Sequence, residues 1–443
     1  MINFYDIAYG IGLGVTAPFW LAKPTARRKV LRAVRDRMGR VPARLGSEPA
    51  ILLHAVSLGE MNATRALVDA LADARPELRF IVSTTTETGY NRGHEIYGSN
   101  PRVTVIHYPL DFSIAITRVL DNLKPSIAIL MELEVWPNFV YQCERRGIPV
   151  ILVNGRMTAG SFRNYRRGGV LVRKMFRRLA AVCAQEHGYS EQFVLLGARP
   201  EVVQVTGTMK FDNAQVVDRV PGADELAETV GLSPRRERIW VCGSTGPGEE
   251  QILLRVYREL LVRFPRLRLV LVPRKPERFD EVADLIRGEA FPLIRRSEAA
   301  RPGLGTSALD PGAAIPVILG DTMGELRNFY SLADVVFVGR TLVDLGAKQH
   351  GSDMIEPAAL AKPTLVGRFT GNFTEVMNLF RAVDGIGEVA TGDELRSSID
   401  ALLSAQEPAI AMGERAREVV RQAQGATLRH RAVILHHLDI RLA

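Results

Sequence analysis

The sequence predicts an α/β protein made of two successive domains, each a parallel β-sheet with helices on both faces. Three observations support this prediction. From residue 50 onward, short apolar segments rich in Val, Ile and Leu alternate with amphipathic segments of helical period. The alternation pauses in a polar, turn-rich stretch at residues 211–238 and then resumes. The length of 443 residues also exceeds what one hydrophobic core usually supports.

The first domain is predicted from seven short apolar segments. Amphipathic stretches such as residues 60–74 and 112–123 lie between them. Because parallel strands are joined by long crossovers, usually helices, this order favours a parallel sheet. The strands are expected at residues 51–57, 79–86, 103–110, 126–133, 149–156, 180–185 and 202–207.

The second domain is predicted from the apolar segments that follow the polar stretch. Two Rossmann-like halves joined by a linker imply a cleft between domains, where ligands often bind. About the last 35 residues have a helical pattern throughout. The expected division is an N-terminal segment at 1–40, a first domain at 41–215 and a second domain at 216–443 with a closing helix. Its strands are expected at residues 239–245, 267–274, 316–321, 334–340 and 363–368.

The N-terminal segment predicts a membrane anchor. Residues 7–22 carry no charge, and residues 23–40 then carry eight Lys or Arg against a single acidic residue, Asp36. The uncharged run is short for a full span of about 20 residues, and no small-residue cleavage site follows it. Phe19 and Trp20 resemble an interfacial aromatic belt, and the positive charges suit an anionic cytoplasmic leaflet. The prediction is an interfacial or marginally spanning anchor with a cytoplasmic body, and the alternative is a buried first helix.

Composition narrows the function classes. A net charge of +8 suits nucleic acid, an anionic membrane or an anionic substrate. Nucleic acid ranks last because aromatic residues are not interleaved with the basic clusters, of which the second is residues 163–178. The eight histidines do not cluster at ligand spacing, so no metal site is predicted, and the three cysteines are expected to be buried free thiols. No Walker A, G-x-S-x-G, C-x-x-C or H-E-x-x-H motif occurs.

A Ser-x-Gly-Glu turn follows the first predicted strand. Ser57, Gly59 and Glu60 lie where this strand gives way to a helix. A glutamate in the first turn of a helix is ordinary, since the macrodipole favours it there. Gly59 favours a functional interpretation of Glu60, because open α/β sheets bind ligands outside the carboxyl ends of their strands.

Other polar residues also follow predicted strands. Glu132 ends a strongly apolar strand, where burying a lone carboxylate is costly, and Lys210 lies beside a turn. The stretch "GSTGPGEE" at 243–250 opens a helix, so its amides either bind an anion or form a plain tight turn. Arg274 ends a strand, and Glu356 begins or bounds a helix. Cations and helix N-termini at one cleft suit a nucleotide phosphate, with Glu356 on ribose hydroxyls.

Several motifs in this order resemble those of bacterial 3-deoxy-D-manno-octulosonic acid (Kdo) transferases. The resemblance implies the GT-B fold and inverting transfer of Kdo from CMP-Kdo to lipid A precursor (lipid IVA), without metal or cofactor. It also implies the cytoplasmic face of the inner membrane, with its anionic lipids as partners. Among the motifs are "LLHAVSLGEMNA", "ILMELEVWPN", "VNGRMTAGSFRNY", "GTMKFD", "LVPRKPERF", "GDTMGEL", "DVVFVGRTLV", "IEPAALAKP" and "GNFTEV".

The resemblance also implies roles for individual residues. Glu60 falls on the general base, and Glu132 and Lys210 fall on residues that support the transition state. The run "GAKQHGSDMIEP" departs from the usual G-G-H-N-P-L-E-P, because Asp353 replaces an asparagine and two additional residues precede it. The implied nucleotide contacts are Pro273, Arg274, Met323, Gly324, Glu325, Asp353, Met354, Ile355 and Glu356.

Two other functions agree with parts of the sequence. One is a GT-B transferase or epimerase that uses another nucleotide sugar, such as a UDP or GDP sugar. The other is a basic, membrane-bound scaffold without activity. The joint presence of Glu60, Glu132, Lys210, Arg274 and Glu356 argues against the scaffold, which has no need of them together.

Overall fold

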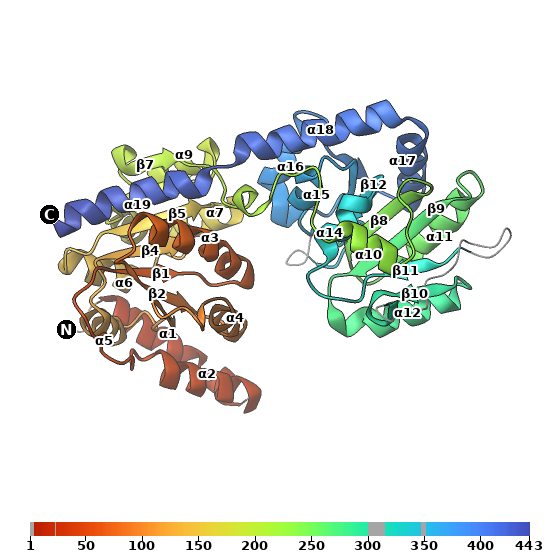
Figure 1. The fold of residues 1–443 in the computed structure, drawn as a ribbon. Helices are drawn as coiled ribbons and strands as arrows, with labels where there is room; N and C mark the ends of the chain where they lie inside the picture. The colour runs from red at the N-terminus through yellow and green to blue at the C-terminus, as the bar shows by residue number, and fades with distance from the viewer. Residues whose placement is uncertain (1–3, 23, 300–314, 347–350) are drawn as a thin grey trace. The chain divides into compact units, whose positions relative to one another are not determined.

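The computed structural model describes residues 4–22, 24–299, 315–346 and 351–443 (Figure 1). The chain divides into two compact units, of which unit 1 is Met1–Asn213 with Ala423–Ala443 and unit 2 is Ala214–Gln422. Each unit contains a seven-stranded sheet in which every strand pair is parallel. The two parallel α/β units predicted from the sequence are therefore confirmed.

The sheet of unit 1 has the order β3-β2-β1-β4-β5-β6-β7. Its seven strands correspond to the seven predicted apolar segments, each of which ends earlier than the pattern predicted. The strands are β1 (Ala50–His54), β2 (Arg79–Thr84), β3 (Val103–His107), β4 (Ile127–Met131), β5 (Val150–Gly155), β6 (Ala181–Ala184) and β7 (Val203–Val205).

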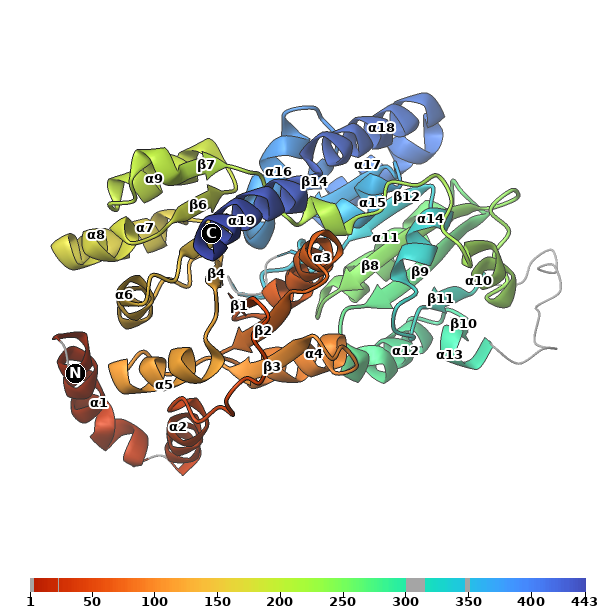
Figure 2. The same cartoon turned by 60° about the vertical axis from the view of Figure 1, so that its left-hand side comes forward.

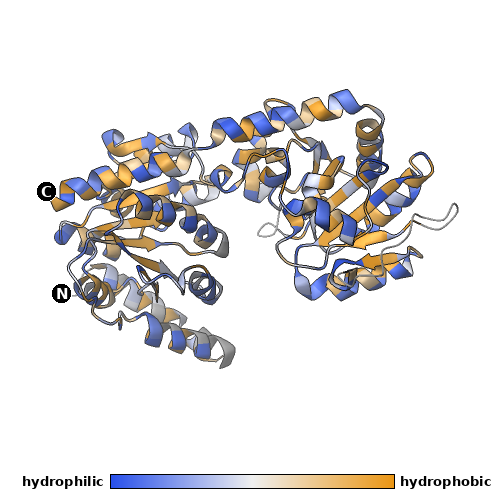
Figure 3. Ribbon diagram, viewed as in Figure 1, coloured by the Kyte–Doolittle hydropathy of each residue, from blue (hydrophilic) through white to orange (hydrophobic). Residues whose placement is uncertain are grey.

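Helices cover both faces of this sheet, because alternate residues of each strand point to opposite faces. Leu52 and Leu130 pack in one hydrophobic cluster, while Leu53 and Ile129 pack in another. In Figure 3 the strands are correspondingly mostly orange, the colour of apolar residues. The helices are α1 (Phe4–Leu21), α2 (Pro24–Arg37), α3 (Leu58–Ala74), α4 (Glu87–Tyr97), α5 (Ser113–Leu123), α6 (Pro137–Arg145), α7 (Ala159–Arg167), α8 (Gly169–Arg177), α9 (His187–Leu195) and α19 (Ala426–Leu442), with 3-10 turns η1 (Pro200–Val202) and η2 (Phe211–Asn213).

The sheet of unit 2 has the order β10-β11-β9-β8-β12-β13-β14. The five predicted strands are present. Strands β10 and β14 were not predicted, since each is a three-residue edge strand without an apolar run. The strands are β8 (Arg238–Thr245), β9 (Leu267–Pro273), β10 (Leu293–Arg295), β11 (Val317–Leu319), β12 (Val335–Val338), β13 (Thr364–Gly367) and β14 (Gly387–Val389).

The helices of unit 2 lie between these strands and at the end of the unit. The polar stretch that was expected to be a linker contains the short helix α10. The helices are α10 (Ala223–Thr229), α11 (Glu249–Leu261), α12 (Phe279–Gly288), α13 (Arg296–Ala299), α14 (Leu326–Leu332), α15 (Ile355–Ala359), α16 (Thr374–Arg381), α17 (Gly392–Ser404) and α18 (Gln406–Ala423), with 3-10 turns η3 (Pro276–Arg278) and η5 (Gly371–Phe373).

The C-terminal segment is two helices, so the prediction of continuous helix is wrong. The break lies at Gly425, whose φ of +89° ends α18 and precedes α19. The carboxylate of Asp212 accepts hydrogen bonds from the N–H groups of Gly425, at 2.7 Å, and Thr427. Helix α19 then lies beside α3 on the sheet of unit 1 (Figure 1), which is why the last residues belong to unit 1 rather than to the second half of the chain.

The N-terminal helix α1 is fixed to unit 1 by a polar contact near its start. Asp6 accepts hydrogen bonds from Ser113 N at 2.7 Å and Asn138 Nδ2 at 3.2 Å, and α1 packs against α6 (Figure 2). Among the described residues, no helix is both long and apolar enough to span a bilayer. The side chains of Phe19 and Trp20, invoked for an interfacial belt, lie outside the described part of the chain.

Buried His430 makes the stability of unit 1 depend on pH. Its Nε2 accepts the N–H of Asn154 at 2.8 Å, and Nδ1 lies 2.6 Å from Ala426 O, so the ring is neutral. Burial lowers the pKa of His430 to about 4, whereas the unfolded chain takes up this proton below a pKa of about 6.5. The contribution of the neutral His430 ring to stability is therefore fully present above about pH 6.5 and is lost as the pH falls toward about 4.

We expect His430→Gln, which keeps an acceptor but cannot titrate, to flatten this pH dependence. Between pH 7 and pH 5 the wild type should lose about 2 kcal/mol more of its free energy of unfolding than the variant. Urea denaturation of the full chain at both pH values measures the difference. His436→Gln, at an exposed position of the same helix, is the control. Parallel pH curves for wild type and His430→Gln would contradict this account.

Candidate functional site

Each sheet has one point where the crossover connections change direction. In unit 1 this point lies between β1 and β4, and in unit 2 it lies between β8 and β12. Open parallel sheets bind their ligands outside the carboxyl ends of the strands at such a point. Glu60 and Glu132 follow β1 and β4, so the topology of unit 1 brings these two predicted residues to the expected place.

Backbone strain marks the same edges. Glu132 and Asn154 follow or end strands of unit 1 with φ values of 53° and 52°, and Ser244 and Arg340 do so in unit 2 with 55° and 60°. Non-glycine residues rarely adopt this left-handed conformation, which costs about 1–3 kcal/mol and recurs at functional sites. The other non-glycine residues with positive φ in the described chain, Lys124, Ala290, Ala361 and Asp384, each lie within three residues after a helix.

Glu60 is part of a capping box at the start of α3. Ser57 is the N-cap, and its Oγ accepts the N–H of Glu60 at 3.1 Å. In return, Glu60 Oε2 accepts the N–H of Val56 at 2.9 Å and Oε1 that of Ser57 at 3.3 Å. The "SLGE" sequence is thus a helix-start signature as well as a predicted active-site turn. The carboxylate is held rigidly at the end of β1, and each oxygen retains capacity to accept a further hydrogen bond.

A second carboxylate, Glu134, lies close to Glu60. Burial raises the pKa of Glu134 and the Glu60 charge raises it further, against the hydrogen bond that Trp136 Nε1 donates to Glu134 Oε2 at 3.0 Å. Both Glu132 and Glu134 were expected at the end of this strand, but a catalytic role was predicted only for Glu132. Glu132 is half-buried, and its N–H bonds Val153 O at 2.9 Å. The Glu-x-Trp spacing at 134–136 was the available signal.

Lys210 is half-buried in the loop that follows β7. Strained Asn154 positions this loop, because its Oδ1 accepts the N–H of Met209 at 3.1 Å. Met209 and Met61, the immediate neighbours of Lys210 and Glu60 in the chain, belong to the same hydrophobic cluster. Unit 1 therefore anchors the segments of Glu60 and Lys210, two of the three predicted catalytic residues, in one core.

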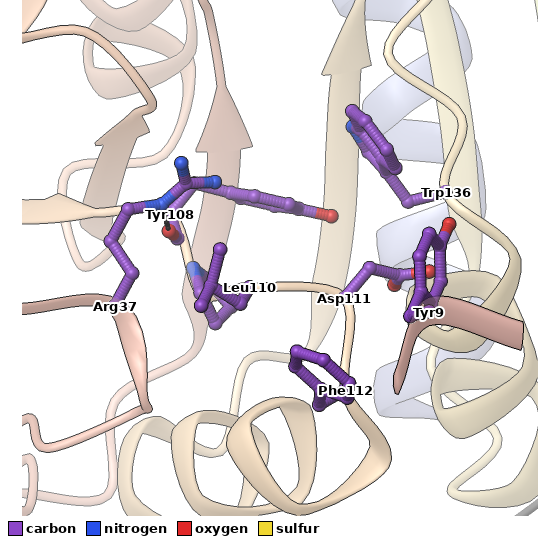
Figure 4. A pocket seen from close by; sticks show the side chains of 8 residues that line it. Tyr9, Arg37, Tyr108, Leu110, Asp111, Phe112 and Trp136 are labelled. Carbon is purple, nitrogen blue, oxygen red and sulfur yellow. Dashed lines mark hydrogen bonds between the residues drawn. The ribbon is translucent and has the colours of Figure 1, made fainter. Parts of the chain in front are cut away.

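Two cavities that share lining residues, one of them lined by Glu134, were not predicted. Tyr9 and Trp136 line both cavities, whose volumes are about 250 and 270 Å³. In the first, Arg37 Nε donates to Tyr108 O at 2.7 Å, and the Tyr108 hydroxyl points toward Trp136 (Figure 4). This hydroxyl is buried without a hydrogen-bond partner in the described structure. The first cavity is lined by Tyr9, Arg37, Tyr108, Pro109, Leu110, Asp111, Phe112 and Trp136, and the second by Tyr9, Leu133, Glu134, Val135, Trp136, Pro137, Tyr165, Val172 and Met175.

In unit 2, Arg274 and Glu356 lie near each other. Burial raises the pKa of the Glu356 carboxyl to about 7 and nearby Asp353 adds to the rise, while Arg327 and Arg274 oppose it. Arg274 is exposed just after β9, where its N–H donates to Thr245 O at 3.1 Å. The hydroxyl of Tyr330 is buried and has no hydrogen-bond partner among the described residues. It interacts electrostatically with Glu356 and Arg274. These groups form a polar cluster suited to an anionic, hydroxylated ligand.

Three of the other predicted nucleotide contacts, Met323, Gly324 and Glu325, lie in one turn before α14. Met323 is 70% exposed and Gly324 has a φ of +90°, so this turn is open. Glu325 accepts hydrogen bonds from Arg296, at 2.8 Å, and from Thr322.

Near Glu356, some of the predicted nucleotide contacts have exposed side chains and others have buried ones. Asp353 is exposed, and its Oδ1 accepts the N–H of Ile355 at 2.8 Å. The side chains of Pro273, Met354 and Ile355 are buried, so only backbone atoms of Met354 and Ile355 remain for a ligand. Residues 347–350 of the atypical run lie outside the described residues.

The glycine-rich turn 243–250 binds a carboxylate of its own chain. Glu249 is fully buried and accepts the N–H of Gly246 at 2.8 Å. It also accepts the N–H groups of Arg340, Thr341 and Leu342 at 2.7–2.9 Å. The amide of Gly246 is therefore already occupied by the Glu249 carboxylate of the same chain. At this position the stretch forms a tight turn, as one of the two interpretations expected.

The chain is similar in sequence to a known family of transferases. A family model described as 3-deoxy-D-manno-octulosonic-acid transferase (kdotransferase) matches residues 32–213. The 3-deoxy-D-manno-octulosonic acid transferase of Haemophilus influenzae is 35% identical over 86% of this chain and 85% of its own length. The chain belongs to the 3-deoxy-D-manno-octulosonic acid transferase family. The Bordetella pertussis transferase is 33% identical over 89% of each chain.

Solved structures place the family in a broader fold. A putative UDP-N-acetylglucosamine 2-epimerase from Listeria monocytogenes matches with a TM-score of 0.56 at 15% identity, over 89% of this chain and 97% of its own. A glycosyltransferase from Rickettsia africae matches with a TM-score of 0.55 at 13% identity, over 89% and 99%. At such identities the likeness shows the fold alone, and that fold is GT-B-like, as the Kdo transferase resemblance implied.

Proposed function

We propose that this member of the family transfers Kdo from CMP-Kdo to the lipid A precursor of lipopolysaccharide, with inversion at the anomeric carbon. The observation that carries the proposal is the rigid Glu60 carboxylate at the end of β1, in a chain 35% identical to a Kdo transferase. The 13–15% identical fold neighbours include both an epimerase and a glycosyltransferase, so the fold alone does not select among nucleotide sugars.

In unit 1, Glu60 acts as the general base. As the acceptor hydroxyl attacks the anomeric carbon of Kdo, its proton passes to the Glu60 carboxylate, and the bond to the CMP phosphate oxygen breaks. Attack on the face opposite the leaving group inverts the anomeric centre, as in inverting glycosidases. The capping hydrogen bonds hold Glu60 in place without using all of its acceptor capacity.

Lys210 and Glu132 support the developing transition state. Lys210 supplies a cation for the Kdo carboxylate or for charge that develops during transfer. Tyr108 lines the first of the two cavities and Glu134 lines the second, and we assign both cavities to the acceptor. Their aromatic walls and the orphan Tyr108 hydroxyl suit a sugar ring with an apolar substituent.

Unit 2 binds the donor nucleotide. Arg274 faces the phosphate, Glu356 accepts hydrogen bonds from ribose hydroxyls, and the open turn at Met323 and Gly324 offers backbone groups. Glu325 holds this turn to Arg296. The departing phosphate is thus stabilised by the Arg274 cation, and the proposed reaction uses neither a metal nor a cofactor.

We also propose that α1 and the basic helices hold unit 1 at the cytoplasmic face of the inner membrane. Phe4, Ile7, Ile11 and Val15 are each more than half exposed and follow each other at helical spacing along α1. Such a stripe suits an interfacial anchor. Exposed cations for anionic lipids are Arg27, Arg28, Arg32 and Arg35 on α2 and Arg166, Arg167 and Arg173 on α7 and α8.

Conversion of Glu60 to Gln tests the proposed reaction. Gln keeps an oxygen for the capping box but cannot take a proton, so we expect a folded protein whose turnover is about 10²–10⁴-fold lower. Mass spectrometry of tetraacyl lipid A precursor incubated with CMP-Kdo, generated in place, measures the product. Glu87→Gln, in the first turn of α4 at the same sheet edge, is the control. Undiminished product from Glu60→Gln would remove Glu60 as the base, and no Kdo product from wild type would refute the reaction.

The nucleotide site should respond to pH through Glu356. With a pKa near 7, this carboxyl becomes a stronger acceptor for ribose hydroxyls as pH rises from 6 to 8.5. We expect cytidine, which lacks a titrating phosphate, to bind the wild type about fivefold more tightly at the upper pH. The Glu356→Gln variant should show no such rise by calorimetry. An equal rise in both proteins would exclude this role of Glu356.

The membrane proposal predicts weaker vesicle binding when the stripe on α1 loses apolar surface. Replacement of both Ile11 and Val15 by Ser should reduce co-sedimentation with phosphatidylglycerol-containing vesicles by about tenfold. Leu45→Ser is the control, since Leu45 is 91% exposed but lies outside α1. Equal losses in the two proteins, or none in either, would contradict docking through α1.

A further inference from the structure

Arg340 stands two residues after β12, at the carboxyl edge of the unit 2 sheet. Its backbone has a φ of 60°, a left-handed conformation that favours Gly, Asn or Asp over Arg. The motifs in the sequence did not single out this residue. An arginine that occupies a strained position beside a nucleotide site suggests that its side chain has a use there.

A buried carboxylate and close backbone packing hold the backbone at Arg340. Glu249 accepts the N–H of Arg340 at 2.7 Å, together with three further amides of the same two loops. The preceding Gly339 has no room for a side chain, because a Cβ would lie 2.5 Å from Thr245 Cα and 2.8 Å from Ser244 O. The exits of β8 and β12 are therefore packed backbone to backbone immediately before Arg340.

The Arg340 side chain passes close to the glycine-rich turn, and its charge interacts with that of Arg274. A Cβ at Gly246 would lie 3.0 Å from Arg340 Cγ, which places the stem of the side chain against this turn. Burial lowers the pKa of Arg340 and the nearby Arg274 guanidinium lowers it further, while Glu249 opposes both effects. Within the described residues, neither guanidinium has a hydrogen-bond or ion-pair partner. Two neighbouring cations of this kind form a site for an anion.

We propose that Arg340 is a second anion-binding residue of the donor site, which holds the nucleotide phosphate together with Arg274, and that Glu249 is the residue that positions it. This inference rests on the proposed function. A phosphate between the two guanidinia relieves their repulsion and receives charge-assisted hydrogen bonds from both. Because the phosphate gains negative charge as the bond to Kdo breaks, the same contacts stabilise the leaving group.

Arg340→Gly tests the proposal without a risk to the fold. Glycine suits the left-handed backbone, so the variant should be at least as stable as the wild type. By calorimetry we expect CMP to bind about tenfold more weakly, and cytidine to bind as before. Ala290→Gly is a matched control, because Ala290 is exposed, belongs to the same unit and has a φ of 59°.

The outcomes separate the possible roles of the side chain. Unchanged CMP affinity in Arg340→Gly would overturn the proposal, and so would equal losses for CMP and cytidine, which would indicate a general effect on the site. Unchanged CMP affinity with a raised KM for CMP-Kdo would move Arg340 to the Kdo carboxylate. If the wild type binds CMP no better than UMP and forms no Kdo product, the proposed function fails instead.

A double-mutant cycle tests the positioning role of Glu249. Glu249→Asp keeps the carboxylate but shortens its reach, so we expect CMP binding to weaken in the wild-type background. In the Arg340→Gly background the same change should have little further effect, because the side chain that Glu249 positions is already absent. Losses that multiply independently in the double variant would refute the positioning role, and the Arg340→Gly result would stand by itself.

Discussion

The hydrogen bonds that carboxylates accept from backbone N–H groups hold the carboxyl edges of both sheets in place. In unit 2, Glu249 binds four amides from the exits of β8 and β12. In unit 1, Glu60 binds two amides at the exit of β1, and Asp111 binds the first amides of α6. The loops at these edges do not take part in the hydrogen bonds between strands, so their backbone N–H groups need other acceptors. Charged acceptors meet this need strongly, and they also fix the loops that carry the proposed chemistry.

This arrangement links stability to function in both units. Glu60 is the N3 residue of the capping box and, in our proposal, the general base, so a change of its charge affects both roles. Strain at Glu132, Asn154, Ser244 and Arg340 is tolerated because surrounding bonds and close backbone packing determine these conformations. A preorganised site needs such rigidity, since groups already in position need not reorganise during the reaction.

The N-terminal helix takes part in the first unit rather than extending away from it. Asp6 bonds to Ser113 and Asn138, and Tyr9 lines both cavities, one of which is also lined by Glu134. The opposite face of the helix exposes the apolar stripe that begins at Phe4. One helix therefore contributes both to the proposed acceptor cavities and to the proposed membrane surface, a suitable arrangement for an acceptor that is itself a lipid.

Local patterns in the sequence determined the class of the fold and most of its strands. Twelve apolar segments became strands, and the central ones carry continuous apolar runs because a parallel strand buried on both faces requires them. The topology of each sheet placed Glu60, Glu132 and Arg274 at strand ends, as their positions in the chain indicated. Only the tertiary structure decided the three-residue strands β10 and β14, whose pairing comes from neighbours rather than from their own pattern. It also decided the return of α19 to unit 1, which depends on Asp212 more than 200 residues away in the chain. Glu134 matters because Glu60 lies near it, and Arg340 because Glu249 and Arg274 lie near it. These neighbours come from other segments of the chain, so no local sequence pattern predicts them.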